Sequence, residues 1–193
     1  MITPRILAFG GSLRRDSYNH KLAAIAAVGG REAGAEITVI SLREFALPVF
    51  DEDLEATIGM PAAAKRLKAI FRENNGLIIA SPEYNSSITA ALKNAIDWVS
   101  RGESDDEPSL SALAGKTAVV CSASPGGLGG LRGLVHLRAI LGSIGITVLP
   151  DQIAIGKAYE AFTPDGALVD EKQQTRVKAL GSNLAKHLSK LLA

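Results

Sequence analysis

Short apolar runs alternate with helix-like stripes of apolar residues along most of the chain. The four apolar residues 77–80 are too few for a helix and too uniform for a strand with one wet face. They predict a parallel strand that is buried on both faces. Pro82 ends this run, because its ring removes a hydrogen-bond donor from the ladder. From Ile88 onward apolar residues fall at 88, 92, 96 and 99, which predicts an amphipathic helix.

The same patterns predict five strands that alternate with five helices. Ser17 or Asn19 is the expected N-cap of the first helix, because short polar side chains accept hydrogen bonds from first-turn amides. We expect residues 42–60 to form a long connection and 101–115 a polar surface loop. The segment 150–166 is expected to be irregular, with an optional brief strand at 153–155. The predicted strands are 5–9, 36–41, 77–80, 117–121 and 146–149, and the predicted helices are 19–27, 62–73, 88–99, 131–144 and 171–192, with Gly34 closing the first helix.

This alternation predicts an α/β fold with right-handed crossovers and helices on both faces of a parallel sheet. Five strands favour the order 2-1-3-4-5, a flavodoxin-like three-layer sandwich, and 193 residues suit one domain spanning 1–193. In that order the switch point lies between the first and third strands. The loops after these two strands should therefore face each other at a ligand site.

The loop after the first strand runs from Gly10 to Asn19 and leads into a helix N-terminus, which attracts anions. Ser12, Ser17 and Asn19 add short polar groups, and Arg14 or Arg15 adds positive charge, so a phosphate monoester is a suitable ligand. The segment matches neither the P-loop pattern nor the G-x-G-x-x-G pattern of dinucleotide sites. The alternative, a Gly-Ser turn that only caps a helix, fits these residues equally well.

The loop after the third strand combines a rigid backbone, a carboxylate, an aromatic face and an amide in Pro82, Glu83, Tyr84 and Asn85. A flat heterocycle with a polar edge needs a stacking surface and backbone groups in its plane. In the alternative interpretation Tyr84 only packs on a helix, while Asn85 or Ser86 caps the next helix.

The loop after the fourth strand is rich in glycine, at 126, 127, 129 and 130. Glycine allows the backbone to approach a ligand closely. A flexible turn explains the same glycines, and by itself that explanation is the better one.

Composition excludes several classes of protein. A net charge of +1 without a basic run argues against a nucleic-acid binder, and no apolar run is long enough for a membrane span. The sole cysteine, Cys121, excludes an intrachain disulfide and fits a cytoplasmic location. We expect Cys121 to be a core residue, and the three histidines have no metal-ligand spacing. Lys93 and Asp97 form an i,i+4 pair of the kind found on helix surfaces.

Taken together, the three loops resemble the NADPH-dependent FMN reductase family, which includes chromate reductases, quinone reductases and some azoreductases. The segment Pro82–Ser87 and its continuation through Leu92–Trp98 carry the most specific part of the match. The other matching segments are Gly11–Arg14 with Ser17 and Asn19, Leu47–Asp53, Ser124–Gly127 and His136–Arg138.

The resemblance implies a non-covalently bound FMN, usually in a homodimer or homotetramer, with NADPH or NADH as the electron donor. It places the FMN phosphate on Ser12, Arg14, Ser17 and Asn19. Residues 82–85 (Pro82, Glu83, Tyr84 and Asn85) would meet the isoalloxazine ring, and Ser124 and Gly126 would close the pocket.

Three functions remain open at this point. The first is an oxidoreductase that passes electrons by ping-pong turnover from NAD(P)H through FMN to quinones, azo compounds, metal oxyanions or free flavin. Because the flavin carries the chemistry, we expect no catalytic side chain and no metal. The second is a flavodoxin-type electron carrier, which a net charge of +1 disfavours, since carriers tend to be acidic. The third, a flavin-free regulatory domain, is disfavoured by the intact polar loops.

Overall fold

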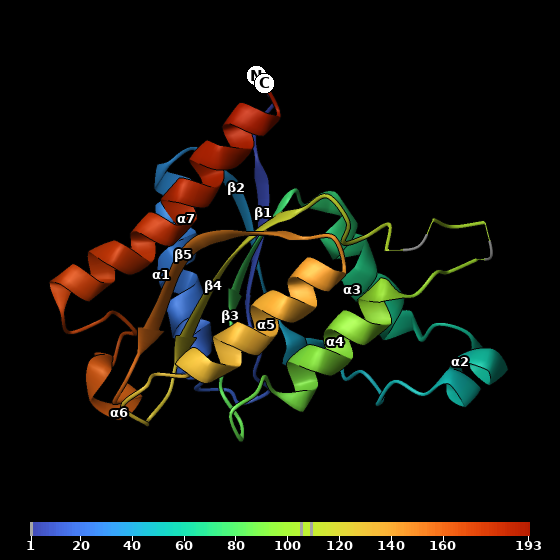
Figure 1. Ribbon diagram of the computed structural model, residues 1–193, viewed down its shortest axis with the longest axis horizontal. Helices are drawn as coiled ribbons and strands as arrows, with labels where there is room; N and C mark the ends of the chain where they lie inside the picture. The colour runs from blue at the N-terminus through green and yellow to red at the C-terminus, as the bar shows by residue number, and fades with distance from the viewer. Residues whose placement is uncertain (1, 105, 109) are drawn as a thin grey trace.

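A five-stranded parallel sheet forms the centre of the molecule (Figure 1). The computed structural model describes residues 2–104, 106–108 and 110–193. The strand order is β2-β1-β3-β4-β5 and every strand pair is parallel, which confirms the predicted topology. The strands are β1 (Arg5–Gly10), β2 (Glu36–Ser41), β3 (Gly76–Ala80), β4 (Thr117–Ala123) and β5 (Thr147–Ile155).

Helices cover both faces of the sheet, as its fully buried central strands β3 and β4 require. In β3, Ile78 and Ala80 face the cluster that includes α1 and α7, whereas Leu77 and Ile79 face the cluster that includes α3, α4 and α5. Alternate residues of β3 thus enter two different cores, which explains why the run contains no polar residue. The helices are α1 (Tyr18–Glu32), α3 (Ala62–Glu73), α4 (Ala90–Ser100), α5 (Leu131–Ser143) and α7 (Glu171–Leu191).

Helix α1 continues beyond the apolar run 19–27 to Glu32, and Gly34, with φ of 90°, follows its end as predicted. Gly29 lies inside the helix because it serves helix packing: a Cβ atom on Gly29 would lie 1.9 Å from the carbonyl oxygen of Lys178 in α7. A Cβ atom on Gly181 of α7 would likewise lie 1.9 Å from the carbonyl oxygen of Ala26. The two helices therefore pack backbone against backbone, which local propensity cannot detect.

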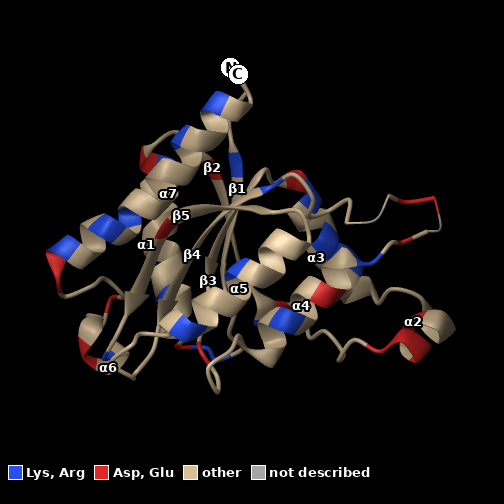
Figure 2. Ribbon diagram, viewed as in Figure 1, with Lys and Arg blue, Asp and Glu red and all other residues tan. Residues whose placement is uncertain are grey.

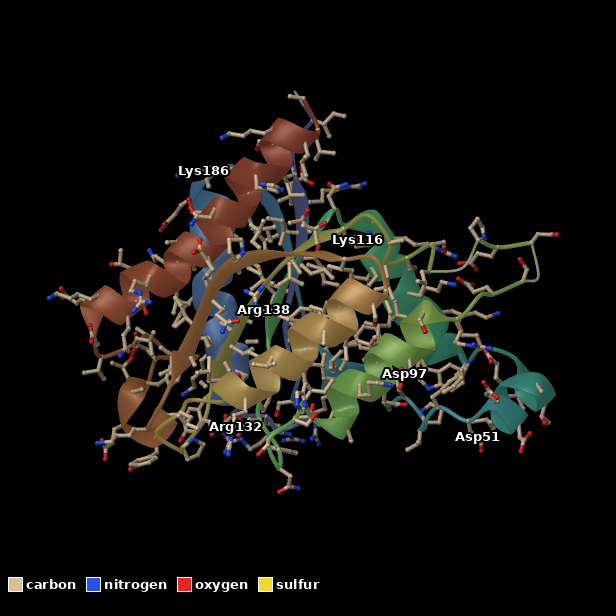
Figure 3. The ribbon with its side chains drawn as sticks, in the orientation of Figure 1. Asp51, Asp97, Lys116, Arg132, Arg138 and Lys186 are labelled. Carbon is tan, nitrogen blue, oxygen red and sulfur yellow. The ribbon has the colours of Figure 1, made fainter. Side chains whose placement is uncertain are left out.

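The predicted long connection 42–60 contains two helices that the apolar pattern missed, η1 (Leu42–Glu44) and α2 (Glu52–Ile58). Helix α2 buries no residue, so it has no apolar stripe to detect. It is stabilised by Asp51, whose Oδ1 accepts hydrogen bonds from the amides of Asp53 (2.8 Å) and Leu54 (3.4 Å). Figure 2 shows the acidic residues of this segment at one side of the molecule, and Figure 3 labels Asp51 there.

The start of this connection is anchored to α4. Both Asn94 Nδ2 and Trp98 Nε1 donate to the carbonyl oxygen of Pro48, each at 2.8 Å, and Asn94 Oδ1 accepts from the amide of Phe50. The rings of Phe50 and Trp98 pack edge to face. Asn94 and Trp98, which follow the loop after β3 in the sequence, therefore hold the backbone at residues 48–50.

The C-terminal part of the sheet also differs from the prediction. Strand β5 runs from Thr147 to Ile155, whereas the sequence predicted a strand at 146–149 and an irregular segment with an optional brief strand at 153–155. The strand at 153–155 is confirmed, and the pairing with β4 is irregular between Ala118 and Val120. Pro150 interrupts the local signal, but Arg138 Nη2 donates to the carbonyl oxygens of Leu149 (2.7 Å) and Pro150 (3.0 Å) and supports the backbone there. A short unpredicted helix, α6 (Ala158–Ala161), follows.

The expected surface loop 101–115 is partly buried. Ala112 and Leu113 enter the core, and Glu107 pairs with Lys68 of α3, whose side chain is 1% exposed. Asp105 and Ser109 lie outside the described residues. Among the described helices, none has both the length and the apolar character needed to span a bilayer.

Candidate functional site

A cavity of about 180 Å³ opens at the carboxyl ends of β1, β3 and β4, where the switch point was predicted. We call it the carboxyl-edge cavity. Of the ten predicted site residues, all line it except Asn85 and Gly126. Tyr18, Ala123 and Pro125 line it although the sequence reasoning did not select them. The lining residues are Ser12, Arg14, Ser17, Tyr18, Asn19, Pro82, Glu83, Tyr84, Ala123, Ser124 and Pro125.

One side of the cavity is the N-terminus of α1. Ser17 is the N-cap, and its Oγ accepts a hydrogen bond from the amide of Asn19 at 3.3 Å. The backbone N–H of Tyr18 has no acceptor among the described residues, and the first turn contains no acidic residue. The guanidinium of Arg14 lies beside this helix end, 4.9 Å from the centre of the Tyr18 ring. This arrangement favours an anion.

Asn19 links two of the three loops through its side chain. Its Nδ2 donates to the carbonyl oxygen of Ala123 at 2.8 Å, and its Oδ1 accepts from the amide of the same residue at 2.9 Å. Asn19 is 3% exposed, so these two hydrogen bonds are shielded from water. The structure thus gives Asn19 the role of fixing the end of β4 against the first turn of α1, in addition to its place in the cavity wall.

The loop after β3 forms a tight turn at the mouth of the cavity. The amide of Tyr84 donates to the carbonyl oxygen of Ser87 at 2.9 Å, and the reciprocal bond is 3.0 Å long. The two central residues, Asn85 and Ser86, have φ angles of 50° and 67°, as a type I′ turn requires. This turn leaves Tyr84 59% exposed and directs Asn85 away from the lining.

Glu83 is held by the start of α5. Its Oε1 accepts from Arg132 Nε and Nη2 at 2.9 and 2.5 Å, and its Oε2 accepts from the amide of Gly133 at 3.1 Å. Burial acts to raise the pKa of Glu83, but the hydrogen bonds from Arg132 and Gly133 outweigh it, and the pKa is lowered. Glu83 is therefore an ionised anchor of the loop. Figure 3 shows Arg132 at the end of α5 that is nearest the site loops.

The third loop closes against β5 and α6. The amide of Ser124 donates to the carbonyl oxygen of Ile155 at 3.0 Å, and the Ser124 carbonyl accepts from the amide of Ala158 at 3.1 Å. Gly130, with φ of 91°, starts α5, and a Cβ atom there would lie 1.9 Å from Ser122 Oγ. Glycine is needed at position 130 because a side chain there would collide with Ser122. Close packing therefore explains this glycine more specifically than the flexibility of a turn does.

Thr89 connects the first two loops, and sequence reasoning did not select it. Its Oγ1 donates to the carbonyl oxygen of Gly11 at 2.5 Å and accepts from the amide of Leu92 at 3.1 Å. Thr89, not Asn85 or Ser86, is therefore the N-cap of α4. A Ser/Thr residue just before the apolar stripe was the available signal, and the polar residues of the turn obscured it.

Burial shifts the pKa of two further titratable groups near the site. It lowers the pKa of His20, although Nε2–H of the ring donates a hydrogen bond to the carbonyl oxygen of Ser12 at 3.0 Å, which acts in the opposite direction. Cys121 is 1% exposed, and burial raises the pKa of its thiol to about 12, which confirms its assignment to the core. Lys93 and Asp97 form an exposed ion pair of 2.8 Å, as predicted.

Comparison with known proteins identifies the family of this chain. Residues 4–160 match the model of the NADPH-dependent FMN reductase family. The chain belongs to this family. A related NAD(P)H-dependent FMN reductase of Pseudomonas aeruginosa is 34% identical over 90% of this chain and 89% of its own. A quinone reductase of Escherichia coli is 38% identical over 71% of this chain and 69% of its own.

A solved structure agrees with these relatives. The flavoenzyme NAD(P)H:(acceptor) oxidoreductase FerB of Paracoccus denitrificans superposes with a TM-score of 0.80 and 28% identity, covering 97% of this chain and 98% of its own. The flavodoxin-like fold, the oxidoreductase class and the pairing of FMN with NAD(P)H that the family description names are thereby confirmed.

The residues of this FMN reductase family member fit FMN chemically. The helix N-terminus with Arg14 and Ser17 suits a phosphate, while the backbone of residues 82–84 and the face of Tyr84 suit the edge and plane of a ring. The cavity is smaller than the range of about 300–1,000 Å³ that enclosed ligand sites occupy, so a mononucleotide would leave part of its surface open to other molecules.

Proposed function

We propose that this protein is an FMN-dependent NAD(P)H oxidoreductase that reduces quinones, with azo compounds, metal oxyanions and free flavin as further acceptors. One observation carries the proposal: the carboxyl-edge cavity joins an anion-binding helix end to a ring-side loop across the switch point of the sheet. A flavin mononucleotide needs one group of residues that binds its phosphate and another that binds its ring. The two loops that could supply these groups follow adjacent strands, β1 and β3.

The residues divide into two groups by role. Ser12, Arg14 and Ser17 bind the phosphate together with the amides of the first turn of α1, while Asn19 sets the distance between this turn and β4. Pro82, Glu83 and Tyr84 border the ring through their backbone and the Tyr84 face, and Ser124 closes the third side, while Asn85 and Gly126 lie outside the lining and shape the adjoining turns. When bound, FMN supplies the chemistry, accepting hydride from a nicotinamide and passing electrons onward.

The protein contributes orientation, and none of its side chains needs to act as an acid or a base. Glu83 is the only carboxylate among the lining residues, and its oxygens are already occupied by Arg132 and Gly133. Tyr84 is 59% exposed at the mouth, so the space beyond the ring is open. A nicotinamide and an acceptor would use this one open face in turn, which is ping-pong turnover.

The proposal extends to the oligomeric state of the protein and to its location in the cell. We expect a homodimer or homotetramer, an expectation supported by the uncovered α2 and by Val49, which is 81% exposed. Light scattering of the purified protein tests this state. A cytoplasmic location agrees with the single free cysteine, which needs no oxidising compartment.

Steady-state oxidation of NADH and NADPH by the FMN-loaded protein tests the function. The assay uses a panel of quinones, azo dyes, chromate and free FMN, with no partner protein added. We expect a yellow protein that oxidises a nicotinamide when a quinone is present, with parallel double-reciprocal plots. A protein that binds FMN but oxidises no nicotinamide would instead be an electron carrier. A protein that cannot be loaded with FMN would contradict both functions.

A further inference from the structure

A stack of side chains leads from the carboxyl-edge cavity to a segment that lies outside it. The guanidinium of Arg14 lies 4.9 Å from the centre of the Tyr18 ring. The ring of Phe162 stacks on the ring of Tyr18, with a distance of 5.5 Å between the ring centres and an interplanar angle of 16°. The Nζ atom of Lys21 lies 6.0 Å from the centre of the Phe162 ring. Arg14 and Tyr18 line the cavity, whereas Phe162 does not.

Arg14 needs such support because it is exposed and little constrained by hydrogen bonds. Its Nη2 donates to the carbonyl oxygen of Asp16 at 2.8 Å, and the described residues offer no second acceptor to its side chain. A flexible arginine loses rotamer entropy when it binds a ligand, and a preorganised one loses less. The face of Tyr18 restricts the guanidinium, and Phe162 restricts Tyr18.

Phe162 itself belongs to a fixed segment. It pairs with Leu168 in an isolated bridge, and the amide of Val169 donates to the carbonyl oxygen of Ala161 at 3.0 Å. At the other end of α6, the amide of Ala158 donates to the carbonyl oxygen of Ser124, a lining residue. The segment 158–169 therefore contacts both the loop after β1 and the loop after β4.

We propose that Phe162 is a positioning residue for phosphate recognition, which it serves by holding Tyr18 and, through it, the guanidinium of Arg14 at the cavity. Phe162 lies just beyond residues 4–160 that match the family model, so this support comes from a part of the chain outside the family's matched region. The inference rests on the proposed function, because it takes the anion at α1 to be the phosphate of FMN.

The test compares binding of FMN with binding of riboflavin, which has the same ring but no phosphate. Dissociation constants are measured from flavin fluorescence for the wild-type protein, F162A and F162Y. Because an exposed cation–π contact is weak, we expect F162A to weaken FMN binding about three- to fivefold. Riboflavin binding should stay unchanged, and F162Y, which keeps the flat ring, should retain FMN affinity. Equal weakening of both ligands would show a merely structural role and overturn the inference.

A double-mutant cycle with R14A gives an independent result that uses FMN alone. If Phe162 acts through Arg14, F162A should cause no further loss of FMN affinity in the R14A background. Additive losses would overturn the inference, as would an F162A variant with wild-type affinity. If F162A fails to fold, as judged by circular dichroism, F162L replaces it, because leucine keeps apolar volume and removes the flat face. A wild-type protein that does not bind FMN would contradict the proposed function. If the wild-type protein binds FMN but the losses in F162A and R14A are additive, only this inference is contradicted.

Discussion

Arg132 and Glu83, 49 residues apart in the sequence, form an ion pair of 2.5 Å that ties the loop after β3 to the first turn of α5. Gly133 adds a backbone hydrogen bond to the other carboxylate oxygen. The carboxylate thus also caps the helix that follows the glycine-rich loop, and it couples the loop after β3 to the loop after β4.

Replacing Glu83 with glutamine should destabilise the protein by about 1–2 kcal/mol, because a neutral amide cannot satisfy both Arg132 and the amide of Gly133. The folded pKa of Glu83 lies below the ordinary value of 4.5. Its contribution is therefore present above pH 4.5 and is lost as the pH falls through the folded pKa. Urea denaturation of both proteins between pH 3 and 7 measures the difference, which should shrink in acid.

D97N is the matched control, since it neutralises an exposed ion pair with Lys93. Such an i,i+4 pair contributes about 0.5 kcal/mol or less. If E83Q and D97N cost the same, the helix-capping role of Glu83 is wrong.

Asn19→Ala should cost more stability than Ser17→Ala. Removing Asn19 leaves the buried amide and carbonyl of Ala123 without partners, at a cost of about 2–4 kcal/mol. Removing the Ser17 hydroxyl loses one N-cap bond, which costs about 1 kcal/mol. Chemical denaturation of the FMN-free proteins measures both.

N19D keeps the acceptor for the amide of Ala123, but it turns a buried carboxylate oxygen toward the carbonyl oxygen of the same residue, so it should be no more stable than N19A. For FMN affinity we expect the opposite order, with a larger loss in S17A than in N19A. The proposal places Ser17 at the phosphate, whereas Asn19 acts only on the spacing of the loops. A Ser17→Ala protein with unchanged FMN affinity would show that the phosphate binds elsewhere.

Tyr84→Ala should leave stability nearly unchanged and alter turnover. The side chain is 59% exposed, and the turn is held by the backbone bonds between Tyr84 and Ser87. Exposed substitutions of this kind change stability by about 0.5 kcal/mol or less. We expect a higher KM for the acceptor or weaker FMN binding, measured by steady-state kinetics and titration. Y84F, which keeps the ring, is the control, and unchanged kinetics in Y84A would exclude a role at the ring.

Glu107→Gln should be strongly destabilising, by about 3–5 kcal/mol, because it leaves the buried ammonium of Lys68 without its nearest carboxylate. Lys68, together with Ser111 and the amide of Glu103, holds the pKa of Glu107 far below its usual range. Stability from this pair is lost only in strong acid. E103Q is the control at neutral pH, because Glu103 is 28% exposed and 4.0 Å from Lys68, and it should cost about 1 kcal/mol or less.

Lys116 should make stability rise between about pH 8 and 10.5. Burial, followed by the charge of Arg5, lowers the pKa of Lys116 from 10.5 to about 8. Between these values the unfolded chain binds more protons than the folded one, so the free energy of unfolding increases with pH. The rise attributable to Lys116 is about 3 kcal/mol at most.

K116M should remove this slope, as measured by urea denaturation at pH 7 and 10. K186M, a change of the same kind on α7, should keep it. Figure 3 shows Lys116 near the edge of the sheet opposite Arg132, so the substitution leaves the carboxyl-edge cavity intact. A K116M protein with the wild-type slope would contradict the lowered pKa.

Apolar periodicity was sufficient to predict the elements that bury apolar faces, and with them the sheet order and the edge of the sheet at which the candidate site lies. The strands at β1, β2 and β3 and helix α3 were predicted within one residue, because periodic burial leaves a local signal. Helix α2 was missed because it buries nothing, and β5 was cut short because Pro150 hides its continuity.

The contacts that hold the residues of the candidate site join distant parts of the chain and are visible only in the folded protein. Asn19 meets Ala123 across 104 residues, and Glu83 meets Arg132 across 49. Phe162 reaches Tyr18 from a segment that has no motif of its own. Such pairs depend on crossover geometry and strand register, which place distant loops at one edge of the sheet. Apolar periodicity reports which face of an element is buried, and it contains no information about which polar side chains meet at the end of that element.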